Sequence, residues 1–104
     1  MNLSPITSHD LDELRKLQPD GWPDIIPETA FYIRSSFCFP LKVEVENSIA
    51  GMGVAIIYNH TAWLAHIIVH PDFRNRGIGL RMVSELLQIV EYHQIQSCLL
   101  IATE

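Results

Sequence analysis

The sequence predicts an α+β fold, with a mixed and mainly antiparallel sheet flanked by helices. Three observations lead to this prediction. Short segments of β-type composition follow one another between residues 42 and 69, with turn residues between them. An amphipathic helical pattern then covers residues 78–91, and a compact apolar segment follows at 98–102. The length of 104 residues and the 48% hydrophobic content suit a single domain, residues 1–104, with a substantial core.

The first forty residues predict one strand and two helices. We expect a short strand at residues 1–6 and a helix at residues 10–17, where leucines recur at helical spacing. Pro27 suits the first position of a second helix, because its missing N–H would have no partner there. The apolar residues of this helix run to Phe37, and Pro40 is expected to end it.

The middle of the chain predicts three antiparallel strands joined by short turns. Apolar and charged residues alternate over residues 42–46, which is the period of a half-buried strand. Residues 49–58 contain Gly51 and Gly53, and glycine inside a strand often marks a bulge or a close backbone approach. Residues 62–69 form the third strand. The expected turns lie at residues 47–48 and 59–61.

The last third predicts a strand–helix–strand unit. The helix is expected to begin near Gly77 or Ile78, and residues 98–102 read as a buried strand that follows it. One apolar row of the helix would face the sheet, with three further residues widening it. The row comprises Leu80, Val83, Leu87 and Val90, and the widening residues are Met82, Leu86 and Ile89.

An excess of acidic residues limits the classes of partner. Seven basic and twelve acidic residues give a net charge of −5, so we expect no general affinity for nucleic acid or for anionic membranes. No apolar run approaches the roughly 20 residues of a membrane span, and the first ten residues lack the features of a signal peptide. Cys38 and Cys98 form no disulfide framework. We therefore expect a cytoplasmic protein with reduced cysteines.

A metal site is not expected. His66 and His70 are four residues apart, a spacing that brings two side chains together on a helix, but they lie in a predicted strand and turn. No further set of ligands accompanies them. The glycine-rich fingerprints of dinucleotide sites and of P-loops are absent from the sequence.

The stretch between the third middle strand and the long helix carries the strongest chemical signal. A loop that leads into a helix can aim successive backbone N–H groups at one point, and the helix start adds unpaired donors and a positive dipole end. Such an arrangement holds phosphate groups. Gly77 and Gly79 would let a ligand approach the backbone closely. The stretch reads Val69-His70-Pro71-Asp72-Phe73-Arg74-Asn75-Arg76-Gly77-Ile78-Gly79.

Basic residues gather at the same place. Arg74, Arg76 and Arg81 are three of the seven basic residues of the chain and lie within eight positions. A local basic cluster on an acidic chain indicates a small polyanion rather than a polymer. The alternative interpretation is a plain turn with two glycines and a solvated arginine face, since the pattern Arg-x-x-Gly-x-Gly is short.

This stretch resembles motif A of the GNAT family of N-acetyltransferases. The family signature is Arg or Gln, two residues, Gly, one residue, then Gly or Ala, after a strand that ends in Val and a turn that often contains His-Pro. Arg74, Gly77 and Gly79 match the signature, with Val69, His70 and Pro71 ahead of them. The resemblance spans nearly the whole chain, and residues 63–80 are its specific part. It implies a GNAT-like (acyl-CoA N-acyltransferase) fold whose fifth strand would be residues 97–103.

The resemblance also implies a co-substrate and the residues that bind it. Acetyl-CoA would place its pyrophosphate on the loop and its pantetheine arm along the backbone of the fourth family strand. An amine would attack the thioester directly, without a covalent enzyme intermediate. The loop residues are Arg74, Asn75, Arg76, Gly77, Ile78 and Gly79, and the strand residues are Ile67, Ile68 and Val69.

The catalytic residues cannot be assigned from the sequence. Strict strand alternation puts Trp63, Ala65, Ile67 and Val69 on one face and Leu64, His66, Ile68 and His70 on the other. If the first face meets the substrate, the positions that match the family's base cannot take a proton. His66 would then be a core or helix-facing histidine. Water, Glu44 or Glu46 stay open as proton acceptors.

The chain departs from the family in length. It stops just after the expected fifth strand, so the family's next helix, its last two strands and its usual proton-donating tyrosine would be missing. Either the chain is a fragment or piece of a larger enzyme, or a shortened protein whose partner covers the sheet edge. An uncovered edge strand invites association, so we expect a homodimer.

Two functions follow from these observations. The first is transfer of an acetyl group from acetyl-CoA to a primary amine, on a small-molecule or peptide acceptor that the sequence does not identify. The alternative is a truncated, non-catalytic GNAT-like domain that binds CoA or a protein partner. The intact arginine–glycine loop favours CoA binding in both cases, and consumption of the thioester with an amine would separate them.

Overall fold

The computed structural model describes residues 1–93 and 97–100, and it contains one five-stranded sheet in the order β1-β2-β3-β4-β5. Each of the first three strands pairs antiparallel with the next, whereas β5 pairs parallel to β4. The strands are β1 (Asn2–Pro5), β2 (Cys38–Val45), β3 (Ser48–Tyr58), β4 (Thr61–Val69) and β5 (Ser97–Leu100). The α+β class and the strand–helix–strand unit are confirmed. Residues 101–103 of the expected last strand lie outside the described residues.

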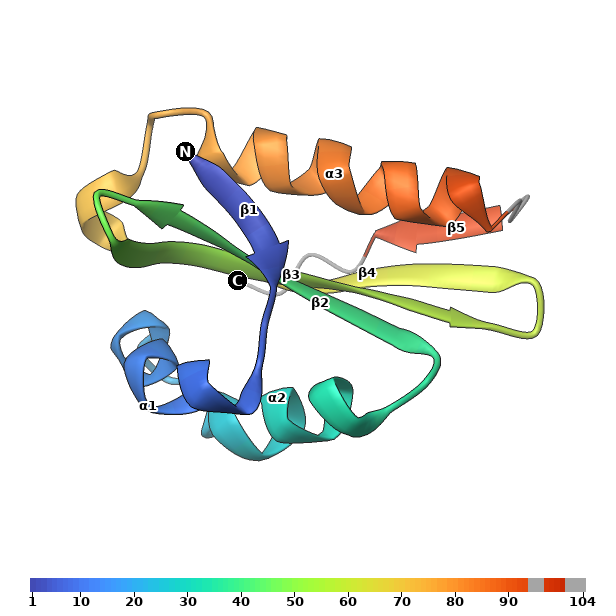
Figure 1. The fold of residues 1–104 in the computed structure, drawn as a ribbon, viewed down its shortest axis with the longest axis horizontal. Coiled ribbons are helices and arrows are strands. Elements are labelled where there is room, and N and C mark those ends of the chain that lie inside the picture. The colour runs from blue at the N-terminus through green and yellow to red at the C-terminus, as the bar shows by residue number, and fades with distance from the viewer. Residues whose placement is uncertain (94–96, 101–104) are drawn as a thin grey trace.

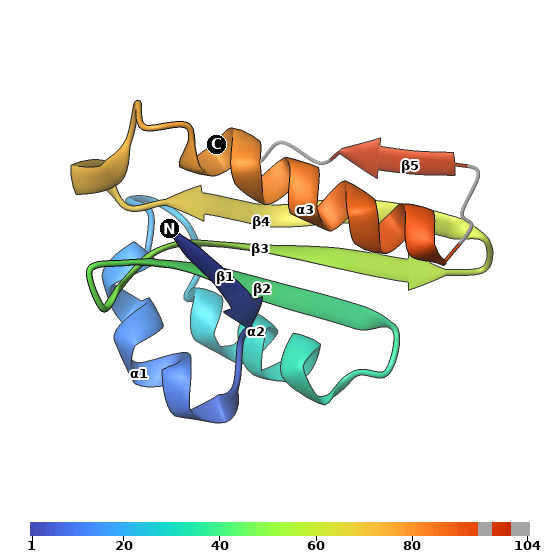
Figure 2. The same ribbon diagram turned by 45° about the horizontal axis from the view of Figure 1, so that its top comes forward.

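Helices cover both faces of the sheet, with α3 on one face and α1 and α2 on the other (Figures 1 and 2). A single turn of 3₁₀ helix precedes α1 and another follows it, so this segment continues from residue 8 to 17. The α-helices are α1 (Leu11–Leu14), α2 (Ile25–Arg34) and α3 (Ile78–Tyr92), and a further 3₁₀ turn, η3, spans Pro71–Phe73. No helix within the described residues is long and apolar enough to cross a membrane.

The second helix differs from its prediction at both ends. It begins at Ile25, because the Asp24 carboxylate caps it by accepting the N–H of Ile26 at 3.0 Å. Pro27 is therefore its third residue, where a missing N–H still costs nothing. The helix ends at Arg34, and Pro40 lies within β2 rather than ending the helix. The Pro40 carbonyl accepts the N–H of Ile6 at 3.0 Å, just past the end of β1.

The sheet-facing row of α3 also differs from its prediction. The buried residues of the helix are Ile78, Met82, Leu86 and Val90. Leu80 and Leu87, which were expected to face the sheet, are 78% and 44% exposed. The helix carries two apolar rows, and periodicity alone does not say which of them meets the sheet. The row at Met82 and Leu86 does so because β3 has a glycine beneath it.

That glycine is Gly53, and it confirms the close approach that the sequence suggests. A Cβ at this position would lie 2.8 Å from Met82 Cγ and 3.0 Å from Leu86 Cδ1. The absence of a side chain thus lets α3 pack directly on β3. Around this contact lies one apolar cluster, which includes Val43, Ala55 and Leu64. A second cluster, beneath α1 and α2, includes Leu14, Ile25 and Ile68.

A β-bulge interrupts β4 and overturns the predicted alternation of its side chains. Between the pairs Met52–Ile68 and Val54–Ala65, Gly53 stands opposite both His66 and Ile67. His66 has a φ of +52°, which is the left-handed conformation. Leu64, Ile67 and Val69 pack on the α3 side, while Ala65 and Ile68 pack on the α1 and α2 side. His66 also faces α2, so two successive residues point to the same face.

Both hairpins close through two-residue turns with positive φ angles. Glu46 and Asn47 join β2 to β3, with φ of 53° and 65°, and Asn59 and His60 join β3 to β4, with φ of 51° and 63°. This conformation matches the right-handed twist of paired strands. The turn predicted at residues 47–48 is therefore one residue too late, since Ser48 already belongs to β3.

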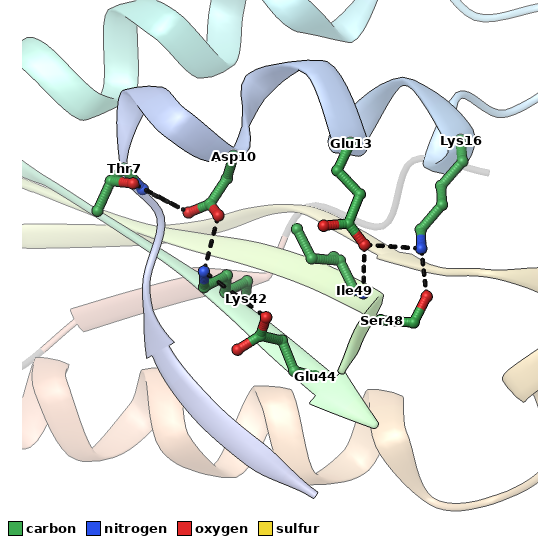
Figure 3. Close-up of polar contacts among 8 residues, drawn as sticks. All are labelled: Thr7, Asp10, Glu13, Lys16, Lys42, Glu44, Ser48 and Ile49. Atoms are coloured by element: carbon green, nitrogen blue, oxygen red, sulfur yellow. Dashed lines mark hydrogen bonds and ion pairs between the residues drawn. The ribbon is translucent and has the colours of Figure 1, made fainter. Parts of the chain in front are cut away.

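A polar network fastens α1 to the β2–β3 hairpin (Figure 3). The Lys42 Nζ lies 2.8 Å from Asp10 Oδ1, and both side chains are mostly buried. The other Asp10 oxygen accepts the N–H of Thr7 at 2.8 Å, so Asp10 bonds back to the residue before the helix. Glu13 accepts the N–H of Ile49 at 2.9 Å and pairs with Lys16 at 2.8 Å.

These contacts lower the pKa of both carboxyl groups. Burial works to raise the pKa of Asp10, but the bonds from Lys42 and Thr7 and the charge of Lys42 together outweigh it and lower the pKa. The bond from the Ile49 N–H, followed by that from Lys16, lowers the pKa of Glu13. Both groups therefore favour folding in their charged form.

Candidate functional site

The loop between β4 and α3 ends in an open helix start. Gly77 is the N-cap of α3, with a φ of +77°, and no side chain caps the helix there. The first N–H groups of a helix have no partner within the helix, and its dipole puts partial positive charge at this end. The 15-residue length of α3 makes it a full-sized helix. The loop therefore offers a set of donors to an anion, as the sequence predicts.

Gly77 and Gly79 differ in whether the backbone conformation requires glycine. Gly77 adopts the left-handed conformation, which costs other residues energy. Gly79 has an ordinary helical conformation, and a Cβ there would meet only Val69 Cγ2, at 3.7 Å. The fold itself would thus accept alanine at position 79. A ligand that approaches the backbone closely is a reason for glycine at this position.

The three arginines of the segment have separate contacts. Arg74 Nε donates to the carbonyl of Val69 at 3.3 Å, which ties the loop to the end of β4. The Arg76 guanidinium carbon lies 5.3 Å from the centre of the Phe73 ring, a cation–π distance. Arg81 Nε lies 3.8 Å from Glu85 Oε2, one helical turn away. All three side chains are exposed, so Arg76 is both oriented and open to solvent.

A cleft of about 670 Å³ lies beside this loop. One wall is formed by residues 67–69 and Arg74, and the other by the chain from Leu17 to Trp22 that links α1 to α2. The predicted strand residues and the first loop residue thus meet at one cleft. The remaining predicted residues, at 75–79, continue from it to the start of α3. Ile68 and Ile78 have buried side chains, so only their backbones are available to a ligand.

One side of β4 along this cleft has no partner strand within residues 1–93 and 97–100. In that part of the chain, β5 pairs with β4 through residues 61–64, and β3 pairs with the other side of β4. A strand that offers N–H and C=O groups can pair with an extended ligand. The bulge at His66 lies two residues beyond Leu64, the last β4 residue of the described pairing.

A second polar group, which the sequence did not predict, joins β4 to α2. The Tyr32 hydroxyl lies 3.0 Å from His66 Nδ1, and His66 Nε2 lies 3.2 Å from Glu28 Oε1. Glu28 and Tyr32 are 38 and 34 residues away from His66 in sequence. Their own spacing of four, on one face of α2, is the signal that could have paired them. Burial, and then the charges of Glu28 and Cys38, raise the pKa of Tyr32 to about 12.

The helix-facing position expected for His66 is confirmed, and the structure also places His70, Glu44 and Glu46. His70 Nδ1 accepts the N–H of Asp72 at 3.0 Å and caps the turn η3, away from His66. Among the side chains that the structure describes, those of residues 1–93, no three of metal-binding type gather. Glu44, an open candidate for the base, lies 3.9 Å from Lys42 on β2. Neither Glu44 nor Glu46 lines the cleft.

Comparison with known proteins agrees with this fold. The sequence model of the family described as "Acetyltransferase (GNAT) family" matches residues 6–104. A search of curated protein sequences finds no significant match. Solved structures resemble the chain closely in fold at low sequence identity, and three of them hold CoA, acetyl-CoA or a CoA-containing bisubstrate analogue.

Three of these structures show the extent of the likeness. A ribosomal-protein alanine N-acetyltransferase from Escherichia coli has a TM-score of 0.79 at 17% identity, over 90% of this chain and 61% of its own. An aminoglycoside antibiotic 6'-N-acetyltransferase from Acinetobacter haemolyticus has a TM-score of 0.83 at 16% identity, over 99% and 80%. A predicted acetyltransferase from Clostridium acetobutylicum, with acetyl-CoA, has a TM-score of 0.76 at 16% identity, over 99% and 81%. The chain thus spans less than two thirds of the first of these proteins.

Proposed function

This chain belongs to the acetyltransferase (GNAT) family, and we propose that it transfers an acetyl group from acetyl-CoA to a primary amine by direct attack. The observation that carries the proposal is the cleft of about 670 Å³ that is lined both by residues 67–69 of β4 and by Arg74 of the loop before α3. A thioester co-substrate with a long arm and a charged head needs both a strand edge and an anion site. The two lie side by side here.

The co-substrate would be held by backbone groups more than by side chains. We assign the pyrophosphate to Arg76 and to the N–H groups at the start of α3, with Arg74, Asn75, Gly77, Ile78 and Gly79 forming the turn around it. Helix N-termini and arginines both favour phosphate. The pantetheine arm would pair with the backbone of Ile67, Ile68 and Val69. Buried side chains at Ile68 and Ile78 suit this, because they fix the backbone without filling the cleft.

The chemistry is the direct attack of an amine on a thioester carbonyl. As the C–N bond forms and the C–S bond breaks, negative charge develops on the carbonyl oxygen and then on the departing sulfur. A preorganised backbone N–H at the bulge of β4 would stabilise the developing oxyanion. Holding the amine and the thioester in one cleft makes their encounter effectively unimolecular. The two protons released by the ammonium go to the thiolate and to solvent.

A second candidate function is CoA or partner binding without turnover. It is favoured by the lining of the cleft, where the ionisable side chains are Asp20 and Arg74. Arg74 is a cation that donates to Val69 and cannot accept a proton, and Asp20 forms no hydrogen bond with the described residues that would place it for this role. Under this alternative the loop would bind CoA with an affinity similar to that of an enzyme, but no thioester would be consumed.

The domain organisation, location, oligomeric state and acceptor class of the protein are also part of what we propose. We propose that residues 1–104 act as one domain, in the cytoplasm, as a homodimer that accepts a small-molecule or peptide amine. β1 and β5 are the outer strands of the described sheet, and outer strands are the usual place of association. No metal, nucleic acid or membrane is required by the proposed chemistry.

Release of free CoA thiol from acetyl-CoA tests the function directly. Two amines represent the acceptors named for similar folds, a peptide that begins with alanine and an aminoglycoside with a free 6'-amino group. We expect thiol release that depends on one of these amines and on protein concentration. Binding of acetyl-CoA without any amine-dependent release would favour the non-catalytic alternative instead.

A further inference from the structure

His66 holds an unusual backbone conformation for its place in the fold. Of the six non-glycine residues with positive φ, four lie in the hairpin turns and one, Asn75, lies in the loop before α3. Among the described residues, His66 is the one in the interior of a strand. Left-handed backbone costs a non-glycine residue energy and persists where the surroundings hold it. The contacts of the His66 side chain show what holds it.

Both ring nitrogens of His66 are engaged, and their partners fix the tautomer. The Glu28 carboxylate can only accept, so His66 Nε2 donates to Glu28 Oε1 over 3.2 Å and carries the proton of the neutral ring. Nδ1 of that ring is then the acceptor, and the Tyr32 hydroxyl donates to it over 3.0 Å. The ring is thus a rigid link between a hydroxyl and a carboxylate.

The three side chains form a line from the core to the surface. Tyr32 is 7% exposed and packs in the cluster that contains Ala65, whereas the side chains of His66 and Glu28 are 14% and 57% exposed. His66 is the one hydrogen-bond partner of the Glu28 carboxylate among the described residues. Glu28 therefore presents one oriented and largely solvent-facing carboxylate whose second oxygen is available.

This carboxylate is connected to the cleft through His66 and Trp22. The His66 ring lies edge-on to the ring of Trp22, with centroids 6.2 Å apart, and Trp22 lines the cleft. His66 also directly precedes Ile67, the first strand residue of the cleft. A cation that reaches the α2 side of β4 would meet both an aromatic ring and a held carboxylate, which together favour an ammonium group.

We propose that Glu28 receives the ammonium group of the acceptor amine at the α2 side of the cleft, and that His66 and Tyr32 are positioning residues that hold its carboxylate. The ligand class is a protonated primary amine. The inference rests on the proposed acetyl transfer and adds the residue that selects the acceptor. It explains why a buried tyrosine and a strained histidine lie beneath an exposed glutamate.

Steady-state kinetics of Glu28→Gln test the proposal, with acetyl-CoA and the two amines used above. Glutamine keeps the shape and still accepts the His66 N–H, but it carries no charge. We expect the KM for the amine to rise by about tenfold or more, because a charge-assisted hydrogen bond becomes a neutral one. We expect kcat and the Kd for acetyl-CoA to change by no more than about threefold, since neither depends on the carboxylate.

Asp24→Asn is the matched control, because it removes the same charge from the start of the same helix. Asparagine caps a helix as well as aspartate does, so the fold is kept. We expect the KM for the amine to stay within about twofold of the wild type, as for an exposed surface charge. An equal rise of KM in both variants would reduce the effect to general electrostatics and overturn the role of Glu28.

Two variants of His66 test the positioning role. Alanine removes the donor to Glu28, whereas the amide of glutamine reaches about as far as Nε2 and can donate in its place. We expect His66→Ala to raise the KM for the amine by about fivefold and His66→Gln to restore at least half of that loss. If both variants raise the KM for the amine equally, and lower the melting temperature equally, His66 has a role in folding alone.

The outcomes separate this inference from the proposed function. A wild type that consumes acetyl-CoA with an amine, beside an unchanged KM in Glu28→Gln, would overturn the role of Glu28 and leave acetyl transfer standing. A folded wild type that binds acetyl-CoA but consumes it with neither amine would overturn the proposed function and the role of Glu28 together.

Discussion

Arg74 Nε donates to the backbone carbonyl of Val69 over 3.3 Å and so joins the loop before α3 to the last residue of β4. The two residues belong to the two halves of the proposed acetyl-CoA site, the phosphate loop and the pantetheine strand. Because Arg74 is used within the protein, Arg76 is the loop arginine with an open guanidinium. Its contact with the Phe73 ring holds it at the mouth of the loop.

Arg76→Ala should weaken acetyl-CoA binding by about tenfold or more, because a charge-assisted contact to phosphate is worth roughly 1.5–3 kcal/mol. Calorimetric titration measures the Kd. Arg34→Ala is the control, since it removes the same charge from an exposed position at the end of α2. A Kd that moves equally in both variants would mean that the loop has no specific phosphate contact at Arg76.

Gly79→Ala should separate binding from folding. The protein leaves room for a Cβ at this position, 3.7 Å from Val69 Cγ2, so the free energy of unfolding should stay the same or rise by up to about 1 kcal/mol. The Kd for acetyl-CoA should nevertheless rise by about tenfold, since the new methyl group would stand between the ligand and the helix N–H groups. An unchanged Kd in this well-folded variant would remove the pyrophosphate from the start of α3.

Gly51→Ala should destabilise the fold, although it adds the same methyl group as Gly79→Ala. A Cβ at Gly51 would lie 2.9 Å from the carbonyl oxygen of Ile68, so β4 would have to move. We expect a loss of about 1–3 kcal/mol in the free energy of unfolding, as for other overpacked sites. Urea denaturation measures it, with Gly79→Ala as the partner variant. Equal stability of the two variants would contradict the close approach of β3 and β4 at this point.

The ion pair between Lys42 and Asp10 predicts a pH-dependent stability. The folded protein lowers the pKa of Asp10 and Glu13 below their ordinary values of 3.8 and 4.5. Their stabilising effect is therefore complete above the pKa values of the unfolded chain and is lost as the pH falls through the lower folded values. We expect the free energy of unfolding to drop as the pH is lowered from 5 toward and below 3.

Lys42→Met tests the cause of that dependence. At pH 7 the variant should lose about 1–3 kcal/mol, because a mostly buried carboxylate loses its charged partner. The difference in the free energy of unfolding between this variant and the wild type should become smaller in acid, because Asp10 takes up a proton. Lys16→Met is the control, because the Lys16–Glu13 pair is more exposed and should be worth about 1 kcal/mol or less. If the loss of stability in Lys42→Met stays constant with pH, the Lys42–Asp10 pair is not the cause of the pH dependence.

The sequence predicted the start of α3 and the antiparallel middle strands because local rules determine them. Gly77 has a positive φ and starts α3 where the pattern Arg-x-x-Gly-x-Gly puts a helix start, and two-residue turns join consecutive strands. The prediction of which row of α3 faces the sheet was wrong, because tertiary packing and not periodicity determines it. Both apolar rows of α3 fit a helix facing the sheet, and Gly53 on a different strand decides between them.

The group formed by Glu28, Tyr32 and His66 could not be predicted for a related reason. Strict alternation assigns His66 to a face, but one extra residue in β4 reverses the faces of every residue beyond it. The bulge itself depends on pairing with β3, which a single strand sequence does not report. Contact with α2 then depends on where that helix begins, and the Asp24 cap sets its start two residues before Pro27.

The measurement that tests the central claim most directly is calorimetric titration of the 104-residue chain with acetyl-CoA, with its mass in solution recorded alongside. We expect binding in the micromolar range, weakened by about tenfold in Arg76→Ala and in Gly79→Ala. A folded chain that binds no acetyl-CoA at millimolar concentration would contradict the proposal, because β4 and the start of α3 would then form no acetyl-CoA site.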